Sequence, residues 1–342
     1  MTSAVLINPP TPPTPVGPTT RKATRPTTKI PQSLIDSARI AHKESFDPQK
    51  HLCFQHPDKV YTMKEIGLEG HGISSIAASE PFPLFTTEAI KQIRAEVFSE
   101  PVLRDCQYTS SFTKNMIRGM GRARAPFSYD AWTSPELLAY VSQVAGIDLT
   151  WCFDYEIGNI NISVEDDEKQ TSKDQDPTAF AWHYDSFPIV CVTMISDCEG
   201  MTGGETAMRM PSGEIKKIRG PTMGTAIILQ GRYIEHQALK ALGGRERTTM
   251  ITPFRPKSHM FRDESVLTTC RAISNWSELY HGYTEYRLEL LEERFRAKLK
   301  EERRREEAKR CFNVRGMRKF LMEQKAYLET TINELVEMED ID

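Results

Sequence analysis

The sequence lacks the features that mark membrane proteins, secreted proteins and zinc knuckles. No apolar run approaches the roughly 20 residues that a helix needs to span a bilayer. The N-terminus has no apolar h-region of a signal peptide. The seven cysteines are scattered and form no Cys-x-x-Cys pair, which is typical of free thiols in a reducing compartment. We therefore expect a cytoplasmic protein with no membrane partner and no disulfide framework.

A strong excess of charge of either sign is also missing. The net charge is −3, so no overall basic field would recruit nucleic acid. The arginine run at 303–305 is flanked on both sides by glutamate pairs, which favours a solvated helix face over a nucleic-acid patch. We expect no nucleic-acid partner.

Acidic residues are absent before Asp36, and residues 1–33 are rich in Pro and Thr. Such a composition cannot bury enough apolar surface to order itself, so a disordered tail is predicted. A mitochondrial transit peptide would also be basic and poor in acids. It would need an amphipathic helix, however, and these prolines forbid one.

Residues 34–148 are predicted to form a mostly helical N-terminal flank. Thr86 or Thr87 can cap a helix that continues to about residue 98 and carries its apolar side chains on one face. A second helix is predicted for 134–144, again with a capping hydroxyl residue at its start.

Residues 149–260 change character, because short strands alternate there with Gly and Pro turns. This pattern is typical of a β-sandwich or barrel rather than a βαβ fold. A polar, acidic segment at 165–178 is predicted to be a long mobile loop and a candidate lid. The predicted strands are 151–164 with a break near Gly158, 188–195, 205–210, 215–218, 225–229 and 247–254.

Residues 261–342 are predicted to form charged C-terminal helices with a break at 313–316. Apolar positions such as Leu288 and Leu299 before the break, and Leu328 after it, mark two short stripes. A solvated helix with two anchored ends accounts for them. A homodimer through these helices is the alternative, although the heptads are not sustained. Together with the strands, the helices predict an α+β fold class.

A candidate metal site begins with His183 and Asp185. They stand two residues apart at the mouth of a predicted strand, so their side chains point to the same face. His236 lies directly beyond the strand 225–229 and its following loop, from where it can reach the same site. Two imidazoles and one carboxylate on one face form the facial triad of non-haem Fe(II) oxygenases, with three positions open.

Histidines and acidic residues at this spacing also have structural interpretations, and other histidines could be ligands. His183 and Asp185 alone would fit a capped turn with a hydrogen-bonded histidine. A second His-x-Asp, at His56, sits in a Pro-containing turn with no strand after it. His259 and His281 are rival third ligands, but the first lies past the final strand and the second on a predicted helix.

Iron with open positions would chelate a 2-oxo acid and take O₂ as second co-substrate. The distal carboxylate of a 2-oxo diacid such as 2-oxoglutarate needs a charged, bidentate partner, for which Arg is the usual choice. Arg247 opens the final strand, and Thr249 points the same way and can donate its hydroxyl. Arg245 is a rival; the threonine two residues further on favours Arg247.

These features in this order resemble the Fe(II)/2-oxoglutarate-dependent dioxygenase superfamily, over about residues 150–256. The arrangement is also similar to fungal members that act in small-molecule metabolism. The motifs that carry the resemblance are His183-x-Asp185, Gly203-Gly204-Glu205-Thr206, Pro221-x-x-Gly224, His236 and Arg247-x-Thr249.

The resemblance implies a double-stranded β-helix, a jelly roll with iron at one open end. It implies His183, Asp185 and His236 as iron ligands. Arg247 and Thr249 would bind 2-oxoglutarate. A polar residue on the strand before the loop would touch the co-substrate, and Asn161 or Tyr155 fits that description.

The resemblance further implies that 2-oxoglutarate is decarboxylated to succinate and CO₂ while a C–H bond is hydroxylated, desaturated or closed into a ring. Related halogenases leave the carboxylate position vacant, and Asp185 fills it, which argues against halogenation. We expect a small organic substrate, such as an amino-acid derivative or secondary metabolite, with Trp182 and Phe187 shaping its pocket. The alternatives are a protein side-chain hydroxylase and a catalytically silent jelly-roll binding module.

Overall fold

The computed structural model describes residues 10–19, 22–27, 29–111, 114–164, 182–220, 222–239, 241–242 and 246–337. The predicted lid at 165–178 and Arg245 lie outside these ranges. The helices are α1 (Gln32–Ser37), α2 (Pro48–His51), α3 (Thr87–Val97), α4 (Glu100–Asp105), α5 (Gly121–Arg124), α6 (Pro126–Thr133), α7 (Pro135–Ala145), α8 (Trp276–Glu307) and α9 (Val314–Glu334), with 3-10 turns η1 (Asp154–Glu156) and η2 (Arg271–Ile273).

The strands are β1 (Val60–Thr62), β2 (Ile76–Ser79), β3 (Phe82–Pro83), β4 (Gln107–Tyr108), β5 (Met116–Ile117), β6 (Leu149–Trp151), β7 (Asn159–Val164), β8 (Ile189–Met194), β9 (Thr202–Gly203), β10 (Thr206–Arg209), β11 (Ile215–Ile218), β12 (Thr225–Leu229), β13 (His236–Ala238), β14 (Ala241–Leu242) and β15 (Glu246–Pro256). The predicted strands 188–195, 205–210, 215–218, 225–229 and 247–254 are confirmed as β8, β10, β11, β12 and β15.

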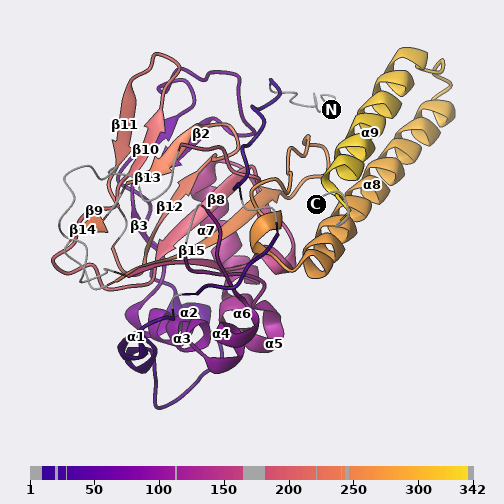
Figure 1. Ribbon diagram of the computed structural model, residues 1–342. Coiled ribbons are helices and arrows are strands. Elements are labelled where there is room, and N and C mark those ends of the chain that lie inside the picture. The colour runs from indigo at the N-terminus through magenta and orange to yellow at the C-terminus, as the bar shows by residue number, and fades with distance from the viewer. Residues whose placement is uncertain are drawn as a thin grey trace.

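The strands form antiparallel sheets, and helices flank them (Figure 1). The largest sheet has the order β1-β2-β12-β8-β15-β7-β5-β4, with β3 added beside β12 and β6 beside β15. A second sheet has the order β11-β10-β13, and β14 pairs with β9. The molecule is thus a mixed helix-and-sheet fold with antiparallel sheets, in agreement with the predicted α+β class.

β15 is the central strand of the large sheet, and its two faces differ. Met250 and Phe254 alternate with period two toward the core and have no exposed surface. Trp132 of α6 covers that face, its indole N–H 3.1 Å from the Met250 sulfur and its ring 6.0 Å from that of Phe254. Burying an aromatic of this size contributes roughly 3–5 kcal/mol, judged by truncation to Ala. The other face carries Arg247, Thr249 and their neighbours.

The two helix starts predicted from capping residues are confirmed. The Thr86 hydroxyl accepts a hydrogen bond from the backbone N–H of Ala89, 3.3 Å, at the start of α3. The Ser134 hydroxyl accepts one from Leu137, 3.3 Å, at the start of α7. Each hydroxyl satisfies an N–H that the first turn leaves without a partner.

The N-terminal flank is less helical than its sequence indicated. β1, β2 and β3 join the edge of the large sheet through β12, and β4 and β5 extend the opposite edge. Strands of two to four residues are too short to display a period, so the pairing that stabilises them is invisible in sequence.

The strand predicted over 151–164 is wrong in its first half. β6 ends at Trp151, the turn η1 follows, and β7 begins at Asn159. Gly158, where the break was expected, has a φ of 68°, a left-handed backbone conformation that glycine adopts without steric cost. Alternating aromatics before it pack as a 3-10 turn, which period-two counting does not distinguish from a strand.

The segment expected to be a disordered tail makes specific contacts where the structure describes it. The Arg232 guanidinium donates to the carbonyl of Pro13, and Thr24 forms an antiparallel bridge with Thr109. Composition indicates only whether a segment can order itself. Here the rest of the protein supplies the surface on which the segment lies.

The C-terminal helices α8 and α9 form an antiparallel hairpin at one side of the molecule (Figure 1). The predicted break is confirmed: Asn313 caps α9 by accepting from the N–H of Gly316, 2.9 Å. Leu291 is buried, whereas Leu288 and Leu328 are exposed. Homodimerisation through this hairpin stays a prediction. Among the described residues, no helix combines the length and the apolar character needed to cross a bilayer.

Candidate metal centre

Two chain segments far apart in sequence meet at the predicted ligands. His183 and His236, the first residue of β13, form an isolated antiparallel bridge: the N–H of each donates to the carbonyl of the other, at 2.9 and 3.0 Å. Their ring centroids lie 4.4 Å apart. The backbone itself therefore brings the two imidazoles to one point.

Asp185 lies between the two imidazoles. Its two carboxylate oxygens are 3.5 Å from Nε2 of His183 and 3.6 Å from Nε2 of His236. The ligand atoms of the three residues all lie within 4.8 Å of one another, and no other such group of His, Cys or acidic side chains occurs in the described ranges. The predicted ligand set is thus assembled in space.

Gly231 makes room for this carboxylate. The N–H of Asp185 donates to the Gly231 carbonyl, 2.9 Å. A Cβ added to Gly231 would lie 1.7 Å from Oδ2 of Asp185, closer than any real contact. A glycine is therefore required here for close approach, not for an unusual φ.

The protonation of His236 is fixed by its surroundings. Nδ1 lies 2.9 Å from the Ile234 carbonyl, which can only accept, so Nδ1 carries a hydrogen. Burial lowers the pKa of His236 to about 4, against the attraction of Asp185. At neutral pH the ring is therefore neutral and Nε2 presents a lone pair.

Asp185 is ionised beside that lone pair. Burial raises the pKa of its carboxyl, but His236, which is charged in the acid range where this carboxyl titrates, and the hydrogen bond with His183 outweigh burial and leave the pKa below its ordinary value. The 3.6 Å spacing would suit an ion pair with His236, yet a neutral ring supplies no charge. Oδ2 of Asp185 is enclosed and has no hydrogen-bond partner. Two electron-pair donors facing each other in a buried place fit a cation between them.

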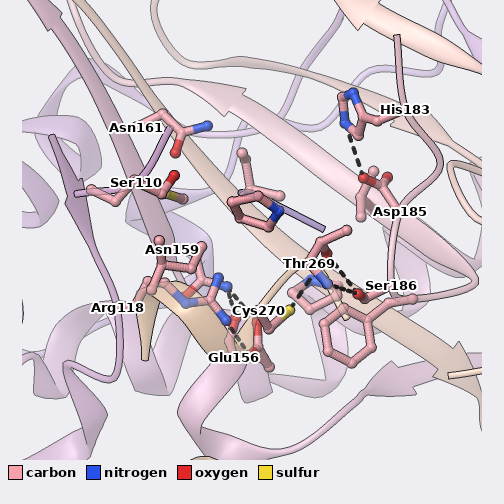
Figure 2. A pocket seen from close by; sticks show the side chains of 17 residues that line it. Ser110, Arg118, Glu156, Asn159, Asn161, His183, Asp185, Ser186, Thr269 and Cys270 are labelled. Atoms are coloured by element: carbon pink, nitrogen blue, oxygen red, sulfur yellow. Dashed lines mark hydrogen bonds and ion pairs between the residues drawn. The ribbon is translucent and has the colours of Figure 1, made fainter. Parts of the chain in front are cut away.

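His183 and Asp185 line a cavity of about 130 Å³, and His236 lies outside its lining (Figure 2). His183 and Asp185 lie on one side, and Asn159 and Asn161 of β7 on the other. Phe187, one of the two aromatics predicted to shape a pocket, lines the cavity. The other, Trp182, lies outside the lining and stacks on the Arg209 guanidinium, 4.2 Å from ring centroid to carbon.

Asn161 is brought to the cavity, and Tyr155 is not. Asn161 lies opposite Thr249 in the β7–β15 register, and its Oδ1 is enclosed without a partner. Tyr155 is buried in η1, where its hydroxyl accepts from the backbone N–H of Asn275, 2.8 Å. A cofactor contact by Tyr155 is thus inconsistent with its position, because the side chain that looked like part of a strand belongs to a turn.

Arg247 and Thr249 share the face of β15 that also carries Ile251, which lines the cavity. Arg247 is half-buried, its Nε is enclosed without a hydrogen-bond partner, and burial lowers its pKa. The adjacent acid, Glu246, pairs with Arg94 instead, 2.7 Å. The guanidinium therefore keeps an enclosed donor that an anion can use.

The rival histidines lie elsewhere. His259 pairs with Glu293, 3.3 Å, and His281 is on α8. Nδ1 of His56 lies 3.1 Å from the carbonyl of Pro57. None of the three belongs to the group of ligand atoms at Asp185.

Sequence reasoning missed a buried polar cluster in the cavity wall. The Arg118 guanidinium donates to Glu156, and Asn159 Nδ2 donates to the same carboxylate, 2.7 Å (Figure 2). Oδ1 of Asn159 has no partner. Because side chains alternate along β7, Asn159 lies on the same face as Asn161, and this spacing could have identified Asn159 as a candidate. Arg118 stands in a stretch without a pattern and gave no signal.

Known proteins resemble the chain only in structure. No protein-family model matches it, and no curated protein does. One similar structure is an oxidoreductase of the 2OG-Fe(II) oxygenase family from Burkholderia pseudomallei, at 13% identity over 41% of this chain and 65% of that one, with a TM-score of 0.31. The chain thus spans slightly less than two thirds of that protein.

Two others are a Pseudomonas putida prolyl-4-hydroxylase and HygX from Streptomyces hygroscopicus, the latter with nickel, 2-oxoglutarate and hygromycin B bound. The first shows 16% identity over 51% of this chain and 89% of that one, TM-score 0.33. The second shows 12% identity over 53% and 83%, TM-score 0.36. At this level of similarity, function is inferred from the side chains of the site alone.

Proposed function

We propose that the protein is an Fe(II)/2-oxoglutarate-dependent oxygenase that oxidises a C–H bond of a small organic substrate with O₂. The observation that carries the proposal is the enclosed Oδ2 of Asp185 beside the neutral Nε2 of His236. With His183 these atoms offer a facial set of two imidazoles and one carboxylate, the arrangement suited to Fe(II) with positions to spare. We infer that the antiparallel sheets are those of a double-stranded β-helix.

Arg247 is the proposed anchor of the 2-oxoglutarate distal carboxylate, with Thr249 beside it. The enclosed Nε of Arg247 supports this role, because an arginine holds a carboxylate through two parallel N–H donors. Asn161, across from Thr249, would touch the same co-substrate through its amide.

Fe(II) in this site would supply the redox chemistry that couples 2-oxoglutarate and O₂ to substrate oxidation. One oxygen atom enters the C–H bond to give an alcohol, and the other enters succinate as CO₂ leaves. The chain holds the reactants in contact: His183, Asp185 and His236 hold the metal, and Arg247 orients the co-substrate. Desaturation or ring closure would use the same residues.

The cavity supports a substrate with an apolar body and a polar group. Phe187, Val190 and Ile251 line one part of it, and the enclosed Oδ1 of Asn159 offers an acceptor in another. A protein side-chain hydroxylase is the second candidate, because an extended segment of this chain places Pro18 in the cavity lining. A catalytically silent binding module would not need the ligand set.

The test is succinate and CO₂ release from 2-oxoglutarate with Fe(II) under air, screened over small metabolites. The wild type should release succinate in a substrate-dependent way, and His183→Ala or Asp185→Ala should abolish it because each removes a ligand. The matched control is His259→Ala, which removes an imidazole that pairs with Glu293 far from the triad. Wild-type activity equal to that of His183→Ala with every compound would refute the proposal.

A further inference from the structure

Residues 10–19 lie beside the cavity, and they have no role in the proposed oxidation reaction. The carbonyl of Pro13 accepts a hydrogen bond from the Arg232 guanidinium, and the backbone N–H of Thr19 donates to Oγ of Ser111, 3.0 Å. Between these two attachments, Pro18 lines the cavity together with His183 and Asp185. The segment thus runs from one anchored point to another, with Pro18 in the lining of the cavity between them.

The first anchor is part of the metal centre's own framework. Arg232 is 4% exposed, and its Nε donates to the Glu264 carbonyl, 3.0 Å. It directly follows Gly231, whose carbonyl holds the backbone of Asp185. One turn therefore fixes both a metal ligand and residues 10–19.

Residues 10–19 pack closely against the chain segment that leads into the cavity wall. Pro12 and Pro15 are buried. A Cβ added to Gly17 would lie 2.6 Å from the backbone oxygen of Thr268, so no side chain fits there without moving the segment. Thr268 directly precedes Thr269 and Cys270, which line the cavity. Val16, by contrast, is 72% exposed and points away from this contact.

The chain that follows lies along another part of the wall. Thr24 bridges Thr109, and the Arg25 guanidinium donates to the Gln107 carbonyl, 2.8 Å, and lies 4.8 Å from the Tyr108 ring. Ser110, next in sequence to Thr109, lines the cavity opposite His183 (Figure 2). These contacts hold the N-terminal segment on both sides of Pro18.

We propose that residues 10–19 form the outer wall of the substrate pocket and that Pro18 determines which substrates reach the metal. A proline ring is rigid and carries no backbone N–H, so it offers the cavity an apolar surface without an unsatisfied donor. Such a wall favours a substrate whose apolar flank lies next to the oxidised C–H bond, and it keeps water out. The substrate role rests on the proposed function; the wall itself does not.

The wall can be tested without metal through Cys270, a cavity-lining thiol that is 4% exposed. We would compare its alkylation by iodoacetamide, followed by peptide mass spectrometry, in the full chain, in a variant lacking residues 1–19, and in Gly17→Val. Both variants should label Cys270 several-fold faster. Val16→Ala is the matched control in the same segment and should label at the wild-type rate.

Cys106 is the internal reference, because it is buried but lies outside the cavity lining and donates to the Gly119 carbonyl, 3.5 Å. Unchanged Cys270 labelling in both variants would overturn the inference. Equal acceleration of Cys106 would do so too, because it would report general loosening. Faster Cys270 labelling in a protein that binds no Fe(II) would leave the wall standing and refute only the proposed oxygenase activity.

Pro18→Ala then tests specificity. The variant should label Cys270 faster while retaining the Fe(II) affinity of the wild type. With any substrate found by succinate release, its KM should change several-fold relative to kcat. A KM and kcat both equal to those of the wild type would contradict a specificity role for Pro18.

Discussion

At the residue scale, the candidate metal centre depends on the absence of a side chain at Gly231. Gly231 leaves the space that the Asp185 carboxylate occupies, and an added Cβ would lie 1.7 Å from Oδ2. We predict that Gly231→Ala lowers the affinity for Fe(II) or Ni(II) by about 10–100-fold, the usual effect of disturbing the support of a ligand. Isothermal titration measures this.

The matched control is Gly316→Ala on α9, where the added Cβ would meet only the Asn313 side chain. This variant should bind metal like the wild type. Gly231→Ala with unchanged metal affinity and unchanged thermal stability would show that Asp185 does not need its present position.

A second residue-scale prediction concerns Arg247. Arg247→Ala should weaken 2-oxoglutarate binding by about 100-fold or more, because it removes two hydrogen bonds to a charged group that contribute roughly 1.5–3 kcal/mol each. Binding of Fe(II) should not change, since Arg247 is no metal ligand. The dissociation constant can be measured by anaerobic titration of the Fe(II)-loaded protein.

The control for this change is Arg296→Ala, which removes an exposed arginine paired with Glu292 on α8. If Arg247→Ala bound 2-oxoglutarate as tightly as Arg296→Ala, the anchor would have to be another residue.

Residue types and spacing pointed to the three candidate ligands, which the structure brings together, although not on a regular strand: His183 lies in an isolated bridge and Asp185 precedes β8. They were insufficient for Tyr155, which alternating aromatics placed on a strand and packing placed in η1. Gly231 could not be anticipated, because its importance lies in a distance to a side chain that is remote in sequence.

At the element scale, a buried guanidinium at Arg287 is among the contacts that join the two helices of the C-terminal hairpin. Arg287 of α8 donates to Asp263, 3.1 Å, to the Thr331 hydroxyl, 2.9 Å, and to the Tyr327 carbonyl, 2.7 Å. We predict that Arg287→Met lowers the free energy of unfolding by about 3–5 kcal/mol, because it leaves the Asp263 carboxylate buried and unpaired. Urea denaturation followed by circular dichroism measures the change.

The double variant Arg287→Met with Asp263→Leu should recover much of that loss, because neither charge then remains buried. Metal affinity should stay at the wild-type value in both variants. A loss below about 1 kcal/mol for Arg287→Met, the range of an exposed pair, would contradict the assigned role.

Elements with strong local signals could be predicted, and elements that depend on partners could not. α3 and α7 start at capping hydroxyls, and β8 and β12 are continuous apolar runs. The short strands β1 to β5 carry too few residues for a pattern, and only their neighbours in the sheet stabilise them.

At the scale of the whole molecule, the sequence indicated an N-terminal segment independent of the folded core. In the structure, this segment contacts the core. The Pro-rich N-terminal segment lies on the cavity wall because Arg232, Thr268 and Ser111 provide contacts from three other regions. Composition describes what a segment can do alone and is silent on surfaces offered by the rest of the chain. Homodimerisation through α8 and α9 likewise depends on a surface outside the segment itself, and it stays a prediction.

The central claim is that His183, Asp185 and His236 bind Fe(II) with open positions for 2-oxoglutarate. The most direct measurement is the visible absorption spectrum of the protein with Fe(II) and 2-oxoglutarate without oxygen. A weak charge-transfer band should appear on adding 2-oxoglutarate and be absent from His183→Ala and Asp185→Ala. A wild-type spectrum with no band, or a band that survives in both variants, would contradict the account.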